Sequence, residues 1–277
     1  MIFHRGVVRG ELRALFDSER ATVDEAALLI ARDNYPSLSL DAYRARLDAL
    51  ADRAVLGLSR SSTLDEQLAS LRDALFTSGG LEGNRENYYD ARNSYLNDVL
   101  DRKLGIPISL ATVALGVGRR AGIVLQGVGF PGHFLLRIGG PSGPLVDPFD
   151  GLRVMERSQL EEILARVFGA ATAPELDHSH TEPVTTRVII VRTLSNLHKV
   201  HSAQKDHARA FQVCDRLVEL EAGAHALRDR GLHALALGSI ATAREDLEAY
   251  LGRGKVSDRE QIEALLRRPG ASTIAWN

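Results

Sequence analysis

Three side chains between Leu104 and Asp150 have the types and the order that a catalytic triad requires. Ser109 offers a hydroxyl, His133 an imidazole and Asp147 a carboxylate. A carboxylate that orients an imidazole allows that imidazole to take the proton of a hydroxyl nucleophile, which is the chemistry of acyl transfer and amide hydrolysis. The sequence therefore predicts a candidate acyl-transfer site at these three residues.

Strand alternation predicts that His133 and Asp147 lie close together. In HFLLRI at 133–138, alternate residues face opposite sides of a strand, so that Phe134 faces the core and His133 faces a cleft. A turn centred on GGPSGP at 139–144 pairs Leu135 with Asp147, which brings Asp147 within side-chain reach of His133. The alternative is a histidine bonded to a backbone carbonyl, beside an aspartate that caps a turn.

Ser109 stands at the expected start of a helix, where two roles fit it. As a nucleophile it needs a general base, because serine stays protonated near neutral pH, whereas a cysteine there would gain from the helix dipole. As a capping residue it would only accept a backbone N–H. Asn93 and Asn97 are four residues apart on the preceding expected helix. They either supply an oxyanion-hole amide and line the site, or are solvated or capping side chains.

The remaining candidate motifs indicate no cofactor and no metal. Residues 127–132, GVGFPG, match the dinucleotide pattern GxGxxG, but a strand follows them and Pro131 interrupts them, so no helix N-terminus would meet a pyrophosphate. Cys214 is expected in the apolar core of a helix and not as a nucleophile. Five histidines lack a cysteine or carboxylate at metal-ligand spacing and are expected at the surface. These are His178, His180, His198, His201 and His207.

Composition limits the class of protein and its partners. The 277 residues are 44% apolar and 25% charged, as in soluble globular proteins, and the formal net charge of −2 gives no footprint for nucleic acid or an anionic membrane. A single cysteine excludes an internal disulfide framework and fits a reducing compartment. Charges interrupt the first sixteen residues, so we expect no signal peptide or membrane span there and a cytoplasmic location. The oligomeric state stays open.

Helical periodicity dominates the first eighty residues, which we interpret as a helical subdomain. Helices are expected over Val23–Asp33 and from a cap at Ser39 to Val55. A third is expected from a capping box of Ser62-Thr63 with Asp65-Glu66 through Phe76. A glycine-rich loop at 77–87 then leads to a further helix capped by Asp90.

Residues 88–150 are expected to form core helices and a small antiparallel sheet. A buried helix runs from Ser109 to Gly122, and small residues at 111, 116 and 118 allow a close neighbour on one side. Strands follow at 123–130, 133–138 and 145–147. This order indicates an α+β domain over residues 1–170.

Residues 169–185 collect Pro, Thr, Ser and His and are the best candidate for a linker. Beyond them the chain is helical, and segments from 194 and 205 resemble segments from 228 and 239 at an offset of about 34 residues, the tetratricopeptide period. Residues 185–277 are therefore interpreted as all-α tetratricopeptide-like repeats.

Three stretches resemble the SirB family of bacterial proteins: NYYDARNSYLNDVLDRKLGIPISL at 87–110, GVGFPGHFLLRI at 127–138 and LVDPFDG at 145–151. The resemblance runs from about Asp24 through the repeats. It implies a transglutaminase-like domain of papain-like fold with a tetratricopeptide-like C-terminal region. The wider superfamily has a Cys-His-Asp triad. His133 and Asp147 fall on its last two positions, and Ser109 falls on or beside the cysteine position.

Two functions follow from these residues, and a third from the repeats. The leading hypothesis is a transglutaminase-fold protein with its nucleophilic cysteine replaced by serine, which binds protein or peptide or acts as a regulator, with little or no catalysis. The alternative is a serine-dependent acyltransferase or amide hydrolase that uses Ser109, His133 and Asp147. In the third hypothesis, the repeats are the functional part and bind a partner helix or an extended peptide in a concave groove. A related domain in a vertebrate F-box protein implies a role in protein handling by analogy alone.

Overall fold

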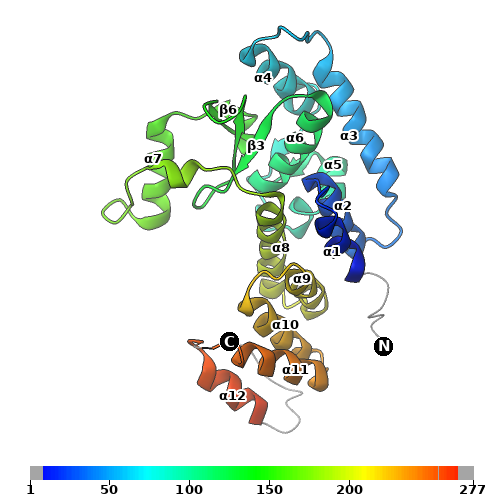
Figure 1. Cartoon of the computed structure of the whole chain (residues 1–277), viewed down its shortest axis with the longest axis vertical. Helices are drawn as coiled ribbons and strands as arrows, with labels where there is room; N and C mark the ends of the chain where they lie inside the picture. Colours follow the sequence, from blue (N-terminus) through cyan, green and yellow to red (C-terminus); the bar gives the residue numbers. More distant parts are fainter. Residues whose placement is uncertain (1–8, 255, 268–277) are drawn as a thin grey trace. The chain divides into compact units, whose positions relative to one another are not determined.

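The structure, a computed structural model, describes residues 9–254 and 256–267 (Figure 1). The chain divides into two compact units, one of residues 20–193 and the other of residues 1–19 with 194–277. The expected domains, 1–170 and 185–277, stay predictions. In the sequence, the boundary between the two units falls inside helix α8 (Thr186–Ala203), after the expected linker.

The helical subdomain of the larger unit begins at the caps expected from the sequence. The Ser39 hydroxyl accepts the Ala42 N–H, and Thr63 and Glu66 form a reciprocal capping box. Helices that start with a satisfied cap need less help from tertiary packing, which is why local sequence identified them. In order, the elements are α2 (Val23–Asn34), α3 (Leu40–Val55), α4 (Leu64–Arg72) and the π-helical turn η1 (Asp73–Thr77).

The single helix expected after Asp90 is wrong, because the chain forms two elements there. The Asp90 carboxylate accepts the Arg92 N–H and caps the 3-10 turn η2 (Ala91–Asn93), and Tyr95 is extended before α5 (Leu96–Arg102) begins. Asn93 and Asn97 therefore do not share one helix. Two short parallel strands that the sequence did not indicate, β1 (Glu82–Gly83) and β2 (Leu104–Gly105), flank this region.

Helix α6 (Pro107–Ala121) is the buried central helix that the sequence predicts, and it ends at Gly122 in the left-handed conformation. A Cβ on Gly116 would lie 2.9 Å from Cβ of Asp24, so the glycine allows α2 to approach closely. Asp24 is fully buried, and its charge is compensated by Arg120 of α6 at 2.7 Å. The packing of α2 on α6 thus includes a buried ion pair.

A four-stranded antiparallel sheet packs beside α6. The register pairs Arg137 with Leu145, and its continuation sets Leu135 opposite Asp147, as expected. His133, however, lies in a bend before the second strand and not within it. The strands are β3 (Leu125–Val128), β4 (Leu135–Ile138), β5 (Leu145–Asp147) and β6 (Arg153–Val154), and the 3-10 turn η3 (Pro148–Asp150) joins the last two.

The core was expected on the Phe134 face of the strand expected at 133–138, but Leu135, on its other face, is just as buried. Helix α7 (Arg157–Phe168) covers it with Leu160 and Leu164, which belong to one core cluster with Leu135 and Met155 (Figure 1). His133, at the end of that face, is half-buried. The short 3-10 turn η4 (His178–Thr181) lies between α7 and α8.

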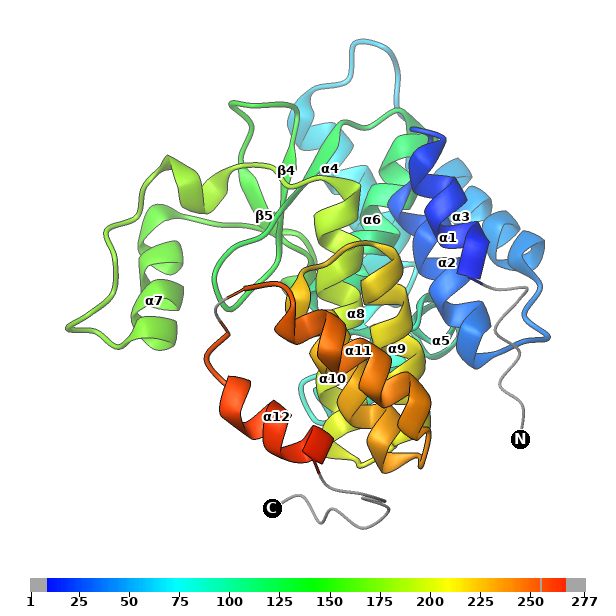
Figure 2. The same ribbon diagram turned by 60° about the horizontal axis from the view of Figure 1, so that its bottom comes forward.

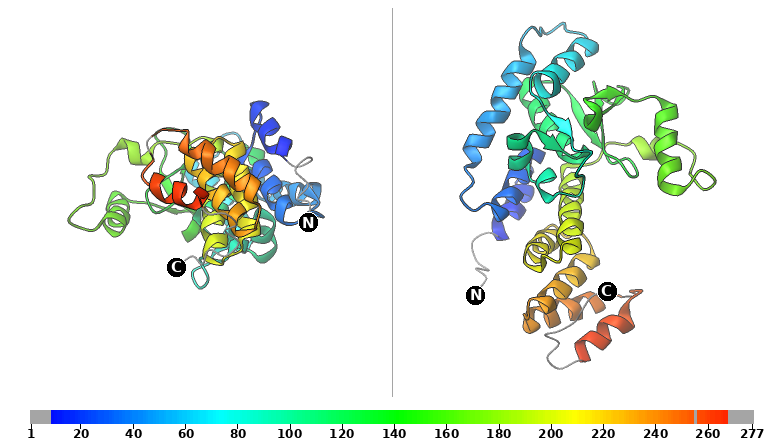
Figure 3. Two further views of the ribbon diagram at one scale, coloured as in Figure 1. Left: turned by 90° about the horizontal axis from the view of Figure 1, so that it is seen from below. Right: turned by 180° about the vertical axis from the view of Figure 1, so that it is seen from behind.

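The smaller unit is all helical within the described residues. Figure 2 shows α10 and α11 side by side, and Figure 3 shows the same helices from two further directions. The half-buried Arg230 of α10 pairs with Asp215 of α9 and with Asp246 of α11 at 2.5 Å each, and so connects three helices. The helices besides the end of α8 are α1 (Arg9–Asp17), α9 (His207–Glu219), α10 (Ala224–Ala236), α11 (Ile240–Leu251) and α12 (Arg259–Arg267).

The α+β class is confirmed by these elements. Within residues 9–254 and 256–267, no helix has both the length and the apolar content that crossing a bilayer requires.

Candidate functional site

A pocket of about 780 Å³ lies in the larger unit beside His133 and Asp147. Its walls come from five parts of the chain: the loop at 85–89, the start of α6, the bend at Gly132 and His133, the segment from Asp147 through Met155, and α7. Most of a small or extended ligand can be enclosed in a pocket of this size. The pocket is therefore the candidate functional site.

His133 and Asp147 form the pair that the sequence predicts. Nε2 of His133 lies 2.9 Å from Oδ1 of Asp147, an ion-pair separation, although the oxygen is off the line of the ring N–H. The same oxygen accepts the backbone N–H of Phe149 at 2.8 Å. Asp147 thus holds the imidazole and caps the following turn, and the two roles proposed for it are compatible.

The surroundings of His133 fix its backbone and leave one ring nitrogen available. Its carbonyl accepts a hydrogen bond from Arg192 at 2.6 Å, and its N–H donates to the Phe130 carbonyl at 3.1 Å. The Phe149 ring meets the imidazole edge to face at 6.4 Å. No described residue hydrogen-bonds Nδ1, so this nitrogen can bond to a ligand or take a proton in the pocket.

Ser109 is not among the residues that line the pocket. It is the third residue of α6 and only 2% exposed, and its hydroxyl donates to the Asn93 carbonyl at 2.6 Å. The same oxygen accepts the Ile106 N–H at 3.0 Å and lies 3.1 Å from the Ile106 carbonyl. The geometry is that of a buried capping serine.

The residue of α6 that does line the pocket is Pro107, the first of the helix. Among the described residues around this pocket, none is Ser, Thr or Cys. The structure thus brings together two of the three residues of the predicted triad and places a proline at the helix start beside them.

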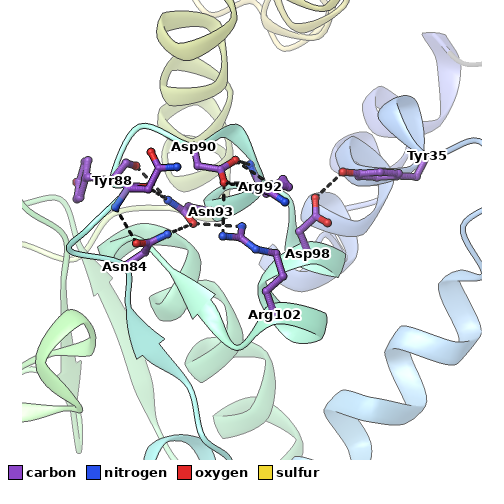
Figure 4. Close-up of polar contacts among 9 residues, drawn as sticks. Tyr35, Asn84, Tyr88, Asp90, Arg92, Asn93, Asp98 and Arg102 are labelled. Atoms are coloured by element: carbon purple, nitrogen blue, oxygen red, sulfur yellow. Dashed lines mark hydrogen bonds and ion pairs between the residues drawn. The ribbon is translucent and has the colours of Figure 1, made fainter.

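Asn93 uses all of its side-chain polar atoms within the protein (Figure 4). Its Nδ2 donates to the carbonyls of Asn87 at 2.7 Å and Tyr88 at 3.2 Å. Its Oδ1 accepts from Asn84 at 3.0 Å and from Arg102 at 3.3 Å. Asn93 therefore organises the loop before η2 and has no free N–H for an oxyanion. Asn97 is also buried and does not line the pocket either.

Charged groups beside Asn93 stabilise η2 and its neighbouring helices (Figure 4). Burial alone would favour neutral Asp90, but hydrogen bonds from Arg92 and the charge of Arg102 hold the pKa of Asp90 below its usual value. Burial raises the pKa of Asp98, whose carboxylate accepts the Tyr35 hydroxyl at 2.6 Å. These contacts join α2, η2 and α5.

Aromatic side chains from the loop at 85–89 form one wall of the pocket, a feature that the sequence reasoning missed. Tyr88 contacts both Tyr89 and Phe149 edge to face, with ring centroids 5.3 and 6.0 Å apart. Tyr89 is 77% exposed, and Arg85 lies over the Phe149 ring at 4.7 Å. In the sequence, only the pair Tyr88-Tyr89 before the Asp90 cap could have indicated this aromatic wall. Phe149 lies about sixty residues further along the chain, and only the fold brings it to the two tyrosines.

The five histidines expected at the surface differ in exposure, and three of them, His180, His198 and His207, are half-buried. His178 is exposed, but His201 is 3% exposed, so its expected surface position is wrong. His201 shares the buried stripe of α8 with Leu194 and Leu197, at the helical spacing of i, i+3 and i+7. Cys214 is fully buried, as expected.

Comparisons with known proteins agree with this architecture. A family model described as the transglutaminase-like superfamily matches residues 41–195, more than half of the chain. A tetratricopeptide-repeat model matches residues 197–268.

Related proteins cover most of the chain. A UPF0162 protein of Xylella fastidiosa strain 9a5c is 40% identical over 241 residues, which are 86% of each chain. A UPF0162 protein of Vibrio cholerae is 27% identical over 218 residues, or 78% of this chain and 80% of that protein. F-box only protein 21 of Homo sapiens is 42% identical over 92 residues, 33% of this chain and 14% of that protein.

Replacing Ser109 by alanine is expected to destabilise the protein by about 1–3 kcal/mol, because the Asn93 carbonyl and the Ile106 N–H lose a buried partner. Urea unfolding of the full chain measures this change. Ser61→Ala is the matched control, since the Ser61 hydroxyl is exposed and contacts Ser59. Equal stability of the two variants would contradict the structural role of Ser109.

A thiol introduced at Pro107 is expected to react with iodoacetamide in the native protein, whereas one introduced at Ser109 is not. Position 107 lines the same pocket as His133 and begins a helix, where a thiolate is favoured. Position 109 does not line the pocket, and its side chain is buried. Mass spectrometry of timed reactions compares Pro107→Cys with Ser109→Cys, each in a Cys214→Ala background. Faster labelling at 109 than at 107 would reverse the assignment of the two positions.

Proposed function

Because the chain belongs to the transglutaminase-like superfamily and carries a tetratricopeptide-repeat region, we propose that it is a protein- or peptide-binding member of that superfamily with little or no acyl-transfer activity. One observation carries the proposal. The pocket that contains His133 and Asp147 receives Pro107 from the start of α6, and no Ser, Thr or Cys stands among the described residues around it.

Catalysis by Ser109 would require the start of α6 to rearrange. The hydroxyl would have to leave the Asn93 carbonyl and the Ile106 N–H, both of which are buried and would lose a hydrogen bond. Each unsatisfied group costs about 1–3 kcal/mol. This cost argues for Ser109 as a structural residue.

The pocket walls suit an extended peptide segment of a partner protein. Tyr88, Tyr89 and Phe149 offer aromatic surface, and Nδ1 of His133 offers one directional polar contact. Asp150 pairs with Arg153 at 2.7 Å and with Arg85 at 3.3 Å, so charge of both signs lies along the rim. Aromatic anchors within a polar rim are typical of peptide and protein contacts.

The tetratricopeptide-repeat region supports the same class of function. Such repeats generally mediate interactions between proteins, because stacked helix pairs present an extended surface. Which protein this region or the pocket binds is a question for experiment.

The alternative, a serine-dependent acyltransferase or amide hydrolase, is favoured by the intact His133–Asp147 pair. In that mechanism Ser109 attacks, His133 takes its proton, and Asp147 stabilises the imidazolium. It needs the Ser109 hydroxyl in the pocket.

Peptide binding is tested with the full chain. Peptides are selected from a displayed random library, and the best binder is titrated by fluorescence anisotropy. Tyr89→Ala is expected to weaken its binding by about tenfold or more, because an aromatic anchor is lost, and His133→Ala is expected to weaken it as well.

Leu56→Ala is the matched control for this experiment, since Leu56 is 74% exposed and does not line the pocket. It should bind the peptide as the wild type does. Selected peptides that bind all three variants equally would count against the pocket as the binding site.

Fluorophosphonate labelling tests the alternative directly. We expect neither the wild-type chain nor Ser109→Ala to be labelled above the level of the heat-denatured protein, because the hydroxyl is buried and bonded to the main chain. Labelling of the wild type that Ser109→Ala and His133→Ala both abolish would establish the serine enzyme instead.

A further inference from the structure

Two imidazoles and one thiol meet in the smaller unit, each from a different helix. They are His198 on α8, Cys214 on α9 and His233 on α10, and one potential ligand atom from each lies within 4.8 Å of the other two. Nε2 of His198 is 2.9 Å from Nε2 of His233. Cys214 and His233 are buried, whereas the His198 side chain is 19% exposed and offers a route from solvent.

The donor types suit zinc, and so does the spacing of the two nitrogens. Zinc binds imidazole nitrogen and thiolate sulfur in tetrahedral sites, with nitrogen at about 2.0–2.1 Å and sulfur at about 2.3 Å, so two nitrogen ligands stand about 3.3 Å apart. The two Nε2 atoms would therefore separate by only a few tenths of an ångström, a change within side-chain freedom. Harder cations such as Mg²⁺ prefer oxygen ligands and are poorly served by this set.

The outward nitrogens of both imidazoles already have partners. Nδ1 of His233 lies 3.1 Å from Nδ1 of His207, and Nδ1 of His198 lies 3.9 Å from a carboxylate oxygen of Asp229. Metal-binding histidines usually direct their second nitrogen to such a partner, which keeps the proton there. With the protons held there, the two inward Nε2 atoms carry lone pairs that face Cys214, and the Ser202 hydroxyl also lies 3.3 Å from Nε2 of His233.

The protonation of the three groups supports this geometry. Burial, with the neighbouring His198 and His207, lowers the pKa of His233 to about 4, so its imidazole is neutral at pH 7. Burial also lowers the pKa of His198 and raises the pKa of the Cys214 thiol. A dication beside the sulfur would stabilise the thiolate that burial alone disfavours.

We propose that His198, Cys214 and His233 bind one zinc ion through two imidazole nitrogens and a thiolate, with a solvent molecule as the fourth ligand. The site links three consecutive helices of the repeat region, and it is independent of the pocket at His133. The competing explanation is a metal-free hydrogen-bonded chain that runs from His198 through His233 to His207. In that hydrogen-bonded arrangement the Cys214 thiol has no role.

Zinc binding is measured on the full chain after its metals are removed, by competition with a chromophoric chelator. We expect one zinc per chain, and Cys214→Ala and His198→Gln should each weaken binding by at least about 100-fold, beyond the 10–100-fold typical of losing an outer partner. His225→Gln is the matched control, because His225 lies on α10, is exposed and is absent from the cluster. It should bind zinc as the wild type does.

Cobalt gives a readout that does not depend on the variants folding well. Wild-type chain loaded with Co²⁺ is expected to show a thiolate-to-cobalt charge-transfer band in the near ultraviolet, which only coordination by the single cysteine, Cys214, can produce. A wild type that lacks this band, or zinc binding that is equal in Cys214→Ala and in the wild type, would overturn the proposal.

Discussion

The hydrogen bond from the Ser109 hydroxyl to the Asn93 carbonyl joins the start of α6 to η2, which directly follows the loop that forms the aromatic wall of the pocket. Both groups are buried, so water cannot replace either partner, and the bond must form within the protein. Gly105 is part of the constraint, because a Cβ there would lie 2.8 Å from the Ser109 oxygen. The hydrogen bond between Ser109 and Asn93 therefore requires a glycine at position 105.

The contact extends to the pocket through Asn93. Its side-chain amide holds the carbonyls of Asn87 and Tyr88, which sets the path of the chain into Tyr89, and the Tyr88 ring then meets Phe149 from the opposite wall. Phe149 in turn donates its N–H to the carboxylate that holds His133. One buried network thus positions both the aromatic wall and the imidazole, although Ser109 and Asn93 do not themselves line the pocket.

Features encoded by neighbouring residues were predictable from the sequence, and features assembled at long range were not. The capping serine and threonine of α3 and α4, and the register that brings Asp147 to His133, follow from local patterns. The α7 cover on the sheet, the partner of Ser109 and the meeting of Cys214 with two histidines depend on how separate helices pack. Ligand spacing along the chain could not reveal that last cluster, because each helix supplies one residue.

The role of Ser109 is decided by helix geometry more than by its type. An α-helix turns by about 100° per residue, so positions 107 and 109 point about 200° apart around the axis. Since Pro107 borders the pocket, a side chain two residues later points toward the protein interior, where Ser109 meets Asn93. A nucleophile able to reach the His133 imidazole from α6 would belong at position 107, and proline has neither a hydroxyl nor a thiol. This geometry supports the proposed function, in which the His133–Asp147 pair is a polar anchor within a binding pocket.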